Sequence, residues 1–221
     1  MLEKDLAPVR LWFKKRSWLI VLGFSFIGVY LSLSFLFIGI GRALPANSLD
    51  NPVLDMIITV APFNLKAREA KASWLREYAM TLEPEDRVEP MQGVISLLEP
   101  ATQWRPKWPY YHLALLDAEY LIDSPPEVVQ ARYDILLDLA PNERGLDSYM
   151  IEVALRSWPK LRSDQKVRIA SNLARSKSYI LNPLLGIIEE EVSVYPELCD
   201  ELPTSIVEPY CLGGRSASHT R

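Results

Sequence analysis

The sequence is poor in cysteine, histidine and glycine, and it lacks the motifs of the common enzyme classes. Its only histidines, His112 and His219, do not lie at ligand spacing from either cysteine, so we predict no metal site. The zinc-protease, nucleophile-elbow, P-loop and dinucleotide-binding motifs do not occur. We therefore expect no cofactor and no enzymatic activity.

Two groups of ionisable residues are the remaining candidates for catalysis. On a helix, only Asp117 comes near the side of His112, while Glu119 points elsewhere, so we expect all three on an exposed surface. The consecutive glutamates 189–191 fan around a helix instead of converging on one ion, which predicts a solvated face. An enzyme that acts on periplasmic glycan through His112 and Asp117 is the third of our functional alternatives.

Charge is missing from one long stretch near the N-terminus. Residues 18–41, WLIVLGFSFIGVYLSLSFLFIGIG, exceed the roughly 20 residues that cross about 30 Å of hydrocarbon. A cleaved signal peptide is the alternative, but its apolar region is normally about 7–15 residues long, and residues 42–46 form a poor cleavage site. We predict an uncleaved transmembrane helix.

Positive charge is unequal on the two sides of this stretch. Five Lys or Arg precede it, whereas only Arg42 follows it before Lys66. Because Lys and Arg favour the cytoplasmic side, we expect the N-terminus in the cytoplasm and the remainder outside it. Residues 1–42 have a net charge of +4, which leaves −8 for residues 43–221. An acidic outer domain argues against nucleic acid as a partner.

The two cysteines both lie in the outer part. Cys199 and Cys211 are twelve positions apart, and in an oxidising compartment such a pair can close a loop, for about 3 kcal/mol in the chain-entropy model. Two unpaired thiols are the alternative, and we favour the disulfide.

Apolar residues recur at helical spacing through most of the outer part, and no alternating run of β-branched residues competes with them. One stripe combines Tyr111, Leu115 and Ala118, and the next contains Val128, Ala131, Ile135, Leu136 and Leu139. The predicted fold class is therefore all-α, with one N-terminal transmembrane helix.

Prolines 62, 100, 141 and 183 recur 38 to 42 positions apart. The residue before a proline is pushed out of the α region, so each proline is expected to close one helix near the start of the next. The interval holds a helical hairpin, which predicts a TPR-like helical-hairpin repeat domain. An irregular helical bundle is the alternative.

The predicted organisation has five parts. They are a basic cytoplasmic N-terminus (1–17), the transmembrane helix (18–41), a linker (42–52), the periplasmic helical-repeat domain (53–198), and a cysteine loop with a disordered tail (199–221).

Residues 104–111, WRPKWPYY, concentrate aromatic residues and prolines in eight positions. Pro109 suits the first turn of a helix that begins near Trp108, and Tyr111 falls on the buried stripe. Two interpretations of Trp104, Trp108 and Tyr110 remain open. They seal neighbouring helices, which we favour, or they form a platform that contacts a partner protein or a sugar.

Three features together resemble a known family: the basic N-terminus with one span, APFNLKAREAKASWL (61–75) and RPKWPYYHLALLDAEY (105–120). Over most of residues 1–160 they are similar to the small VpsP-type proteins of exopolysaccharide biosynthesis loci in marine gammaproteobacteria. The resemblance implies a bacterial inner-membrane accessory of polysaccharide assembly or export, with polymerase or export proteins as partners and polysaccharide as a candidate ligand. It supplies no catalytic residues. The alternative function is an accessory of secretion, pilus or division machinery.

Overall fold

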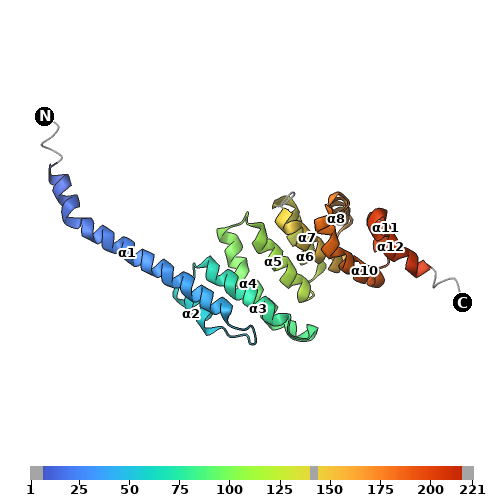
Figure 1. Ribbon diagram of the computed structural model, residues 1–221, viewed down its shortest axis with the longest axis horizontal. Helices are drawn as coiled ribbons and strands as arrows, with labels where there is room; N and C mark the ends of the chain where they lie inside the picture. Colours follow the sequence, from blue (N-terminus) through green and yellow to red (C-terminus); the bar gives the residue numbers. More distant parts are fainter. Residues whose placement is uncertain (1–6, 140–143, 216–221) are drawn as a thin grey trace. The chain divides into compact units, whose positions relative to one another are not determined.

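The computed structural model describes residues 7–139 and 144–215 (Figure 1). Over these ranges every regular element is a helix and no strand occurs, so the all-α prediction is confirmed. The predicted TPR-like repeat is not confirmed. The chain divides into two compact units, Met1–Trp74 and Leu75–Arg221, and each is described by itself.

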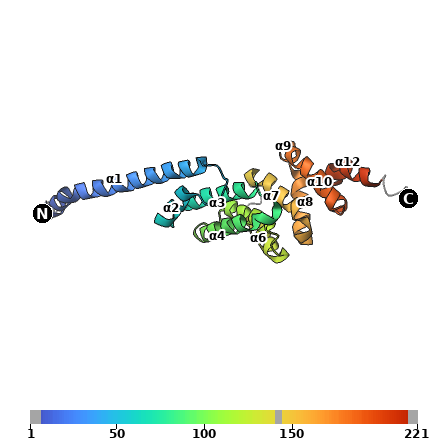
Figure 2. The same ribbon diagram turned by 90° about the horizontal axis from the view of Figure 1, so that it is seen from below.

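The first unit is dominated by one long helix, α1 (Ala7–Ala43). Its segment Trp18–Ala43 has 26 residues and a mean hydropathy of 2.2, which makes it long and apolar enough to cross a membrane. The helix ends two residues beyond the predicted end at residue 41. Helix α2 (Pro52–Val60) begins at the last residue of the predicted linker, and it runs back beside the end of α1 in both views (Figures 1 and 2).

One buried side chain joins α1 to α2. Asn51, fully buried, caps α2 by accepting the amide of Leu54 on its side-chain oxygen, at 3.1 Å. Its side-chain nitrogen donates to the carbonyl oxygen of Gly41 at 2.9 Å, so it also satisfies a carbonyl in the last turn of α1. Without a side chain, Gly41 leaves room for Leu54, which would lie 2.6 Å from an added Cβ.

Helix α3 (Leu65–Ala79) follows α2 after a turn that contains Pro62, as the proline rule predicts. In the first unit, Lys71 of α3 forms an ion pair with Asp55 of α2. The boundary between the two units falls within α3.

The second unit consists of the end of α3 and of helices that follow one another in chain order from α4 to α12 (Figures 1 and 2). The longer ones are α4 (Val88–Trp104), α5 (Pro109–Leu121), α6 (Pro126–Leu139), α7 (Arg144–Arg156), α8 (Ser163–Arg175), α10 (Leu185–Val194) and α12 (Thr204–Arg215). The shorter ones are η1 (Pro84–Arg87), η2 (Trp158–Lys160), α9 (Ser178–Leu181), η3 (Asn182–Leu184) and α11 (Leu198–Glu201).

A continuous apolar core extends from α5 to α12. Trp158 and Tyr133 are its largest fully buried side chains. The Tyr133 hydroxyl donates to the carbonyl of Met150 at 3.1 Å, so its burial leaves no polar group unsatisfied. Trp158 also donates its ring N–H to the carboxylate of Glu201, which ties η2 to α11.

The predicted buried stripe of α6 is wrong in part. Val128 and Ile135 are 41% and 37% exposed, and the buried positions are Val129, Tyr133, Leu136 and Leu137. The segment offers two overlapping stripes with spacings of three and four. The one that includes Tyr133 is buried because its ring and hydroxyl both find partners in the core.

The proline rule is also wrong at Pro100, which lies inside α4 instead of ending it. A proline inside a helix removes one backbone hydrogen bond. Burial of Val94, Leu98 and Ala101 on one face of α4 offsets that loss. Pro183 lies in η3, between α9 and α10, and Pro141 lies outside the described residues.

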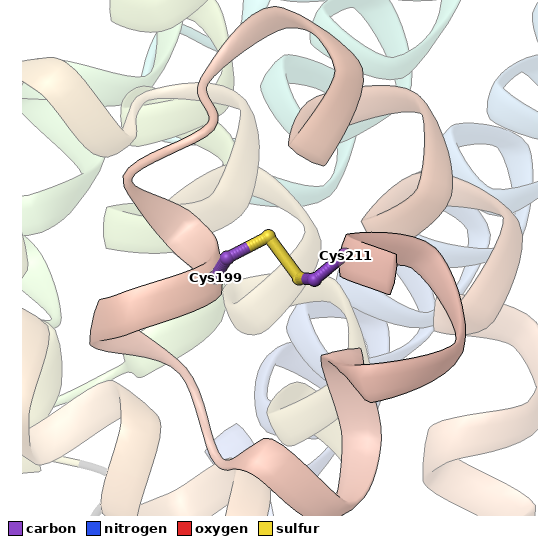
Figure 3. The surroundings of a disulfide bond; sticks show 2 residues. All are labelled: Cys199 and Cys211. Carbon is purple, nitrogen blue, oxygen red and sulfur yellow. A yellow bond between two sulfur atoms is a disulfide. The ribbon is translucent and has the colours of Figure 1, made fainter. Parts of the chain in front are cut away.

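Cys199 of α11 and Cys211 of α12 form a disulfide, with an S–S distance of 2.00 Å and a Cα–Cα distance of 5.8 Å (Figure 3). The bridge fastens α12 to the rest of the unit. Helix α12 continues to Arg215, so the helix extends about one turn beyond the cross-link, into the segment for which disorder was predicted. Residues 216–221, the rest of the predicted tail, lie outside the described range.

Candidate interaction surface at the α4–α5 connection

The aromatic stretch forms the connection between α4 and α5. Helix α4 ends at Trp104, a tight turn bonds the amide of Trp108 to the carbonyl of Arg105 at 3.0 Å, and α5 begins at Pro109. Trp108 is the N-cap residue, with extended backbone angles, and Pro109 occupies the first helical position. The predicted helix start is therefore confirmed. Tyr111 is buried as expected, at 3% exposure.

The other three aromatic side chains face solvent to a large extent. Trp104 is 64% exposed, Trp108 42% and Tyr110 43%, which disagrees with the interpretation that they are sealed between helices. The rings of Trp108 and Tyr110 lie 5.3 Å apart between centroids and are tilted by 39°. Their flanking prolines and the turn keep the side chains on the outside of the connection, where the core cannot cover them.

Positive charge accompanies these rings. Arg105 and Lys107, between the two tryptophans, are exposed, and no acidic residue occurs from Thr102 to Tyr111. On a chain with a net charge of −4, this connection is a local basic and aromatic surface. We refer to Trp104, Arg105, Lys107, Trp108 and Tyr110 as the aromatic–basic loop.

A buried histidine supports the loop from the helix side. His112 is 5% exposed, and its Nε2 lies 3.1 Å from the carbonyl oxygen of Pro106. Its Nδ1 faces Nη1 of Arg132 at 3.5 Å. Because a guanidinium can only donate, Nδ1 is the acceptor, and the ring proton lies on Nε2, which donates to Pro106. The backbone of the loop is thus attached to α5.

Arg132 of α6 completes this support by pairing with Glu119 of α5. Its Nε lies 3.1 and 3.2 Å from the two carboxylate oxygens, and its Nη2 lies 2.5 Å from one of them. Both side chains are largely buried, with side-chain exposures of 15% and 4%. Such a forked pair fixes the direction of the guanidinium, which in turn orients His112.

Burial is the largest cause of the pKa shifts of His112 and Glu119. It lowers the pKa of His112 below the ordinary 6.5, with a smaller contribution in the same direction from the charge of Arg132, while the bond to Pro106 opposes the shift. Burial also raises the pKa of Glu119 above its ordinary value, and the bonds from Arg132 act against that. His112 is accordingly neutral near pH 7 and acts as a structural donor.

The prediction that His112, Asp117 and Glu119 lie on an exposed surface is wrong. They are 5%, 5% and 3% exposed. Each is buried because a partner distant in sequence compensates its polar group: Arg132 for His112 and Glu119, and Arg76 for Asp117.

Asp117 belongs to a second buried group. Nε of Arg76 lies 2.5 Å from Oδ2 of Asp117, and Nη2 of Arg76 lies 2.6 Å from the hydroxyl of Tyr149. The Arg76 guanidinium also lies over the Tyr149 ring, 5.5 Å from its centroid. The structure therefore separates Asp117 from His112, each held by its own arginine, and does not combine them into an acid–base pair.

The three consecutive glutamates are not equivalent. Glu189 and Glu190 are exposed, as expected for a solvated face, but Glu191 is 7% exposed and pairs with Arg156 at 3.4 Å. The expectation is wrong for Glu191 because α10 packs against α7, which brings Arg156 to it.

A separate cavity of about 430 Å³ lies within the second unit. Tyr120, Tyr195, Arg87, Arg156 and Lys160 contribute to its lining. Each of its cations has a partner: Lys160 binds Asp123 at 2.5 Å, Arg156 binds Glu191, and Arg87 donates to the carbonyl of Leu82 at 3.0 Å. Asp123 has a left-handed backbone, φ 56°, but this residue follows the end of α5, where such a conformation is common.

The residues that sequence reasoning missed are the arginines that stabilise the buried acids. Arg76 and Arg132 lie 41 and 13 positions from their acidic partners, and neither pair follows a helical three- or four-residue spacing. Arg105 and Lys107 stand inside the quoted motif, and their alternation with aromatic residues was the available signal for a charged surface.

Along residues 18–139 and the part of 144–211 with placed side chains, no group of three or more His, Cys, Asp or Glu is arranged to hold a metal ion. Comparisons of the chain with protein-family models, curated proteins and solved structures find no match.

Proposed function

We propose that the protein is a single-pass inner-membrane accessory of exopolysaccharide biosynthesis or export, whose helical domain lies in the periplasm and binds partner proteins. The apolar segment Trp18–Ala43 supports the anchor. The excess of Lys and Arg before it supports a cytoplasmic N-terminus. The Cys199–Cys211 disulfide supports an oxidising compartment for the second unit.

The aromatic–basic loop is the observation that favours a binding role over a purely structural one. Exposed tryptophan and tyrosine supply large, stiff contact surfaces and are frequent at the energetic centres of interfaces. Arg105 and Lys107 add positive charge, which suits an anionic polysaccharide or an acidic face of a polymerase or export protein. The support from His112 keeps the loop backbone ordered before binding, which lowers the entropic cost of association.

The proposal assigns no enzymatic activity to the chain. The candidates for acid–base chemistry, His112 and Asp117, are each committed to structural partners, Pro106 and Arg76. If they were catalytic, conservative replacement by Gln and Asn would abolish the phenotype that the protein confers even where the folded protein accumulates normally.

Deletion of the chromosomal copy, followed by measurement of exopolysaccharide, tests the proposal. We expect loss of the polymer, and we expect the full-length protein, purified from gently solubilised membranes, to carry polysaccharide polymerase or export proteins with it. Normal polymer together with recovery of secretion, pilus or division proteins would instead establish the alternative function.

Variants of the loop make the test specific. Trp104→Ala combined with Lys107→Ala should reduce recovery of the partners and polymer output, while melting of the purified protein stays nearly unchanged, because both side chains are exposed. Trp158→Ala is the contrasting control, since loss of a fully buried tryptophan should destabilise the protein by about 3–5 kcal/mol. Full partner recovery by the stable loop variant would contradict a role for this surface.

A further inference from the structure

Helix α2 is apolar almost all round, which is unusual for a short helix of a domain in water. Its sequence PVLDMIITV has two polar residues, Asp55 and Thr59. Asp55 is paired with Lys71, and the hydroxyl of Thr59 donates to the carbonyl of Asp55 at 2.8 Å. The two polar side chains of α2 therefore have partners within the unit, which lowers the cost of placing this helix against lipid.

The two apolar faces of α2 have different surroundings. Leu54 and Ile57, at 0% and 6% exposure, form its packed face. On the other side Met56 is 49% exposed and Val60 is 74% exposed, and Phe63, in the turn that follows, is also 74% exposed. An apolar surface thus continues from α2 into the α2–α3 turn.

The antiparallel course of α2 determines the level of this surface along α1 (Figures 1 and 2). Leu54 packs on Gly41, and the six residues from Leu54 to Val60 advance by about 9 Å at 1.5 Å per residue. Val60 consequently lies at about the level of Phe35, which belongs to the apolar segment of α1.

The length of the apolar segment places that level at the edge of a bilayer. Its 26 residues extend about 39 Å, whereas the hydrocarbon layer is about 30 Å thick. If hydrocarbon begins near Trp18, it ends about 20 residues later, near Ile38. The tip of α2 then reaches slightly below this boundary, and the start of α2 stands above it.

Cationic side chains surround the tip on its α3 side. Arg68 donates from Nε to the carbonyl of Pro62 at 2.9 Å. Lys66 has a 54% exposed side chain and is paired with Glu69 at 2.6 Å. Apolar or aromatic residues flanked by Lys and Arg are typical of segments that rest at the headgroup level of a membrane.

We propose that the end of α2 and the turn that follows it insert Val60 and Phe63 into the outer surface of the same bilayer that α1 crosses, with Met56 near the boundary. The first unit is then held by a span and by a second, shallow lipid contact, which limits rotation of α3 about the span. This inference rests on the proposed membrane anchor, and its test must separate the two.

Single added cysteines that carry a nitroxide label provide that test, because the native cysteines are paired and do not react. Full-length Val60→Cys is placed in nanodiscs of phosphatidylethanolamine and phosphatidylglycerol, with one protein per disc. Collision rates are measured with oxygen, which concentrates in lipid, and with a water-soluble nickel chelate. We expect the label at 60 to lose most of its collisions with the chelate, several-fold relative to Val167→Cys in α8, a control of similar exposure at 68%.

Phe26→Cys reports the span, since residue 26 lies within the apolar segment and is 67% exposed in the isolated chain. A label at 26 shielded from the chelate together with a label at 60 as accessible as that at 167 would overturn the second contact while retaining the anchor. Accessibility at both 26 and 60 would overturn the anchor itself. Shielding at 60 that is present at several copies per disc and absent at one copy per disc would assign the surface to a second chain and contradict lipid insertion.

Discussion

At the scale of single residues, the most informative positions are buried charges with one distant partner. Glu119 is 3% exposed, and Arg132 provides its neutralising contacts as a forked pair. A charge removed from water is tolerated only when such contacts exist, and its loss is costly because the remaining partner stays buried.

Arg132→Ala should therefore destabilise the protein by about 3 kcal/mol, because it leaves the Glu119 carboxylate buried and unpaired. Arg168→Ala is the matched control: Arg168 is 49% exposed at its side chain and lies 3.8 Å from the exposed Asp138, so we expect a change below about 1 kcal/mol. Urea unfolding of the full-length protein in mild detergent gives both values. Equal effects would contradict the importance assigned to the buried pair.

His112 predicts a dependence of stability on pH. Its pKa is lowered in the folded protein by burial, and the unfolded chain therefore binds a proton at this residue more readily. The free energy of unfolding should fall as pH decreases below about 6.5, the ordinary value for histidine.

Glu119 has the opposite effect on the free energy of unfolding in acid, since burial raises its folded pKa above the ordinary 4.5.

Comparison with His112→Gln isolates the contribution of the histidine, because Gln cannot take up the proton. Unfolding measured at pH 7.5 and pH 5.5 should show a smaller loss of stability in the variant than in the wild type. An identical loss in both would mean that His112 is not neutral and buried in solution.

At the scale of elements, contact between α1 and α2 depends on a glycine. A Cβ added to Gly41 would lie 2.6 Å from the side chain of Leu54, which is fully buried. A Cβ on Gly39, two residues earlier in the same helix, meets nothing within 4 Å.

Gly41→Ala should accordingly loosen α2, at a cost of about 1–3 kcal/mol from overpacking, and weaken the bond from Asn51 to the Gly41 carbonyl. Gly39→Ala should be neutral or slightly stabilising, since glycine is unfavourable inside a helix. Hydrogen exchange of the α2 amides in nanodiscs measures the difference. Equal protection of α2 in the two variants would contradict the close packing.

Local sequence patterns predict some features of the helices and not others. The start of α5 follows from Trp108-Pro109 because proline geometry is local. The buried face of α6 does not follow, because two stripes fit the helical period and the choice depends on the partners of Tyr133 in other helices. Pro100 lies inside α4 because the burial of its neighbours outweighs a local preference.

The candidate surface was predictable in its composition and not in its exposure. Trp104 and Trp108 stand out in the sequence, but whether such rings are covered depends on helices that no local pattern places. The buried trio of His112, Asp117 and Glu119 was misjudged for the same reason. Each is compensated by an arginine from another helix, and pairings of that kind carry no periodic signal.

At the scale of the whole molecule, the chain contains a long apolar helix and a helical domain that carries the aromatic–basic loop. The acidic balance of residues 43–221, net −8, makes the local positive charge of that loop distinctive. The disulfide between α11 and α12 fits a domain that matures outside the reducing cytoplasm. The orientation of the membrane anchor therefore matters for the binding surface. The aromatic–basic loop can meet partners in the periplasm only if the helical domain lies outside the cytoplasm.

The orientation of the chain in the membrane is the most direct test of this account. Alkaline phosphatase, which is active only in an oxidising compartment, is fused to the C-terminus of the full-length protein, and a fluorescent protein that matures only in the cytoplasm is fused in a parallel strain. We predict an active phosphatase and no fluorescence, with both fusions recovered in the membrane fraction. A fluorescent fusion with an inactive phosphatase would place the helical domain in the cytoplasm and contradict the account.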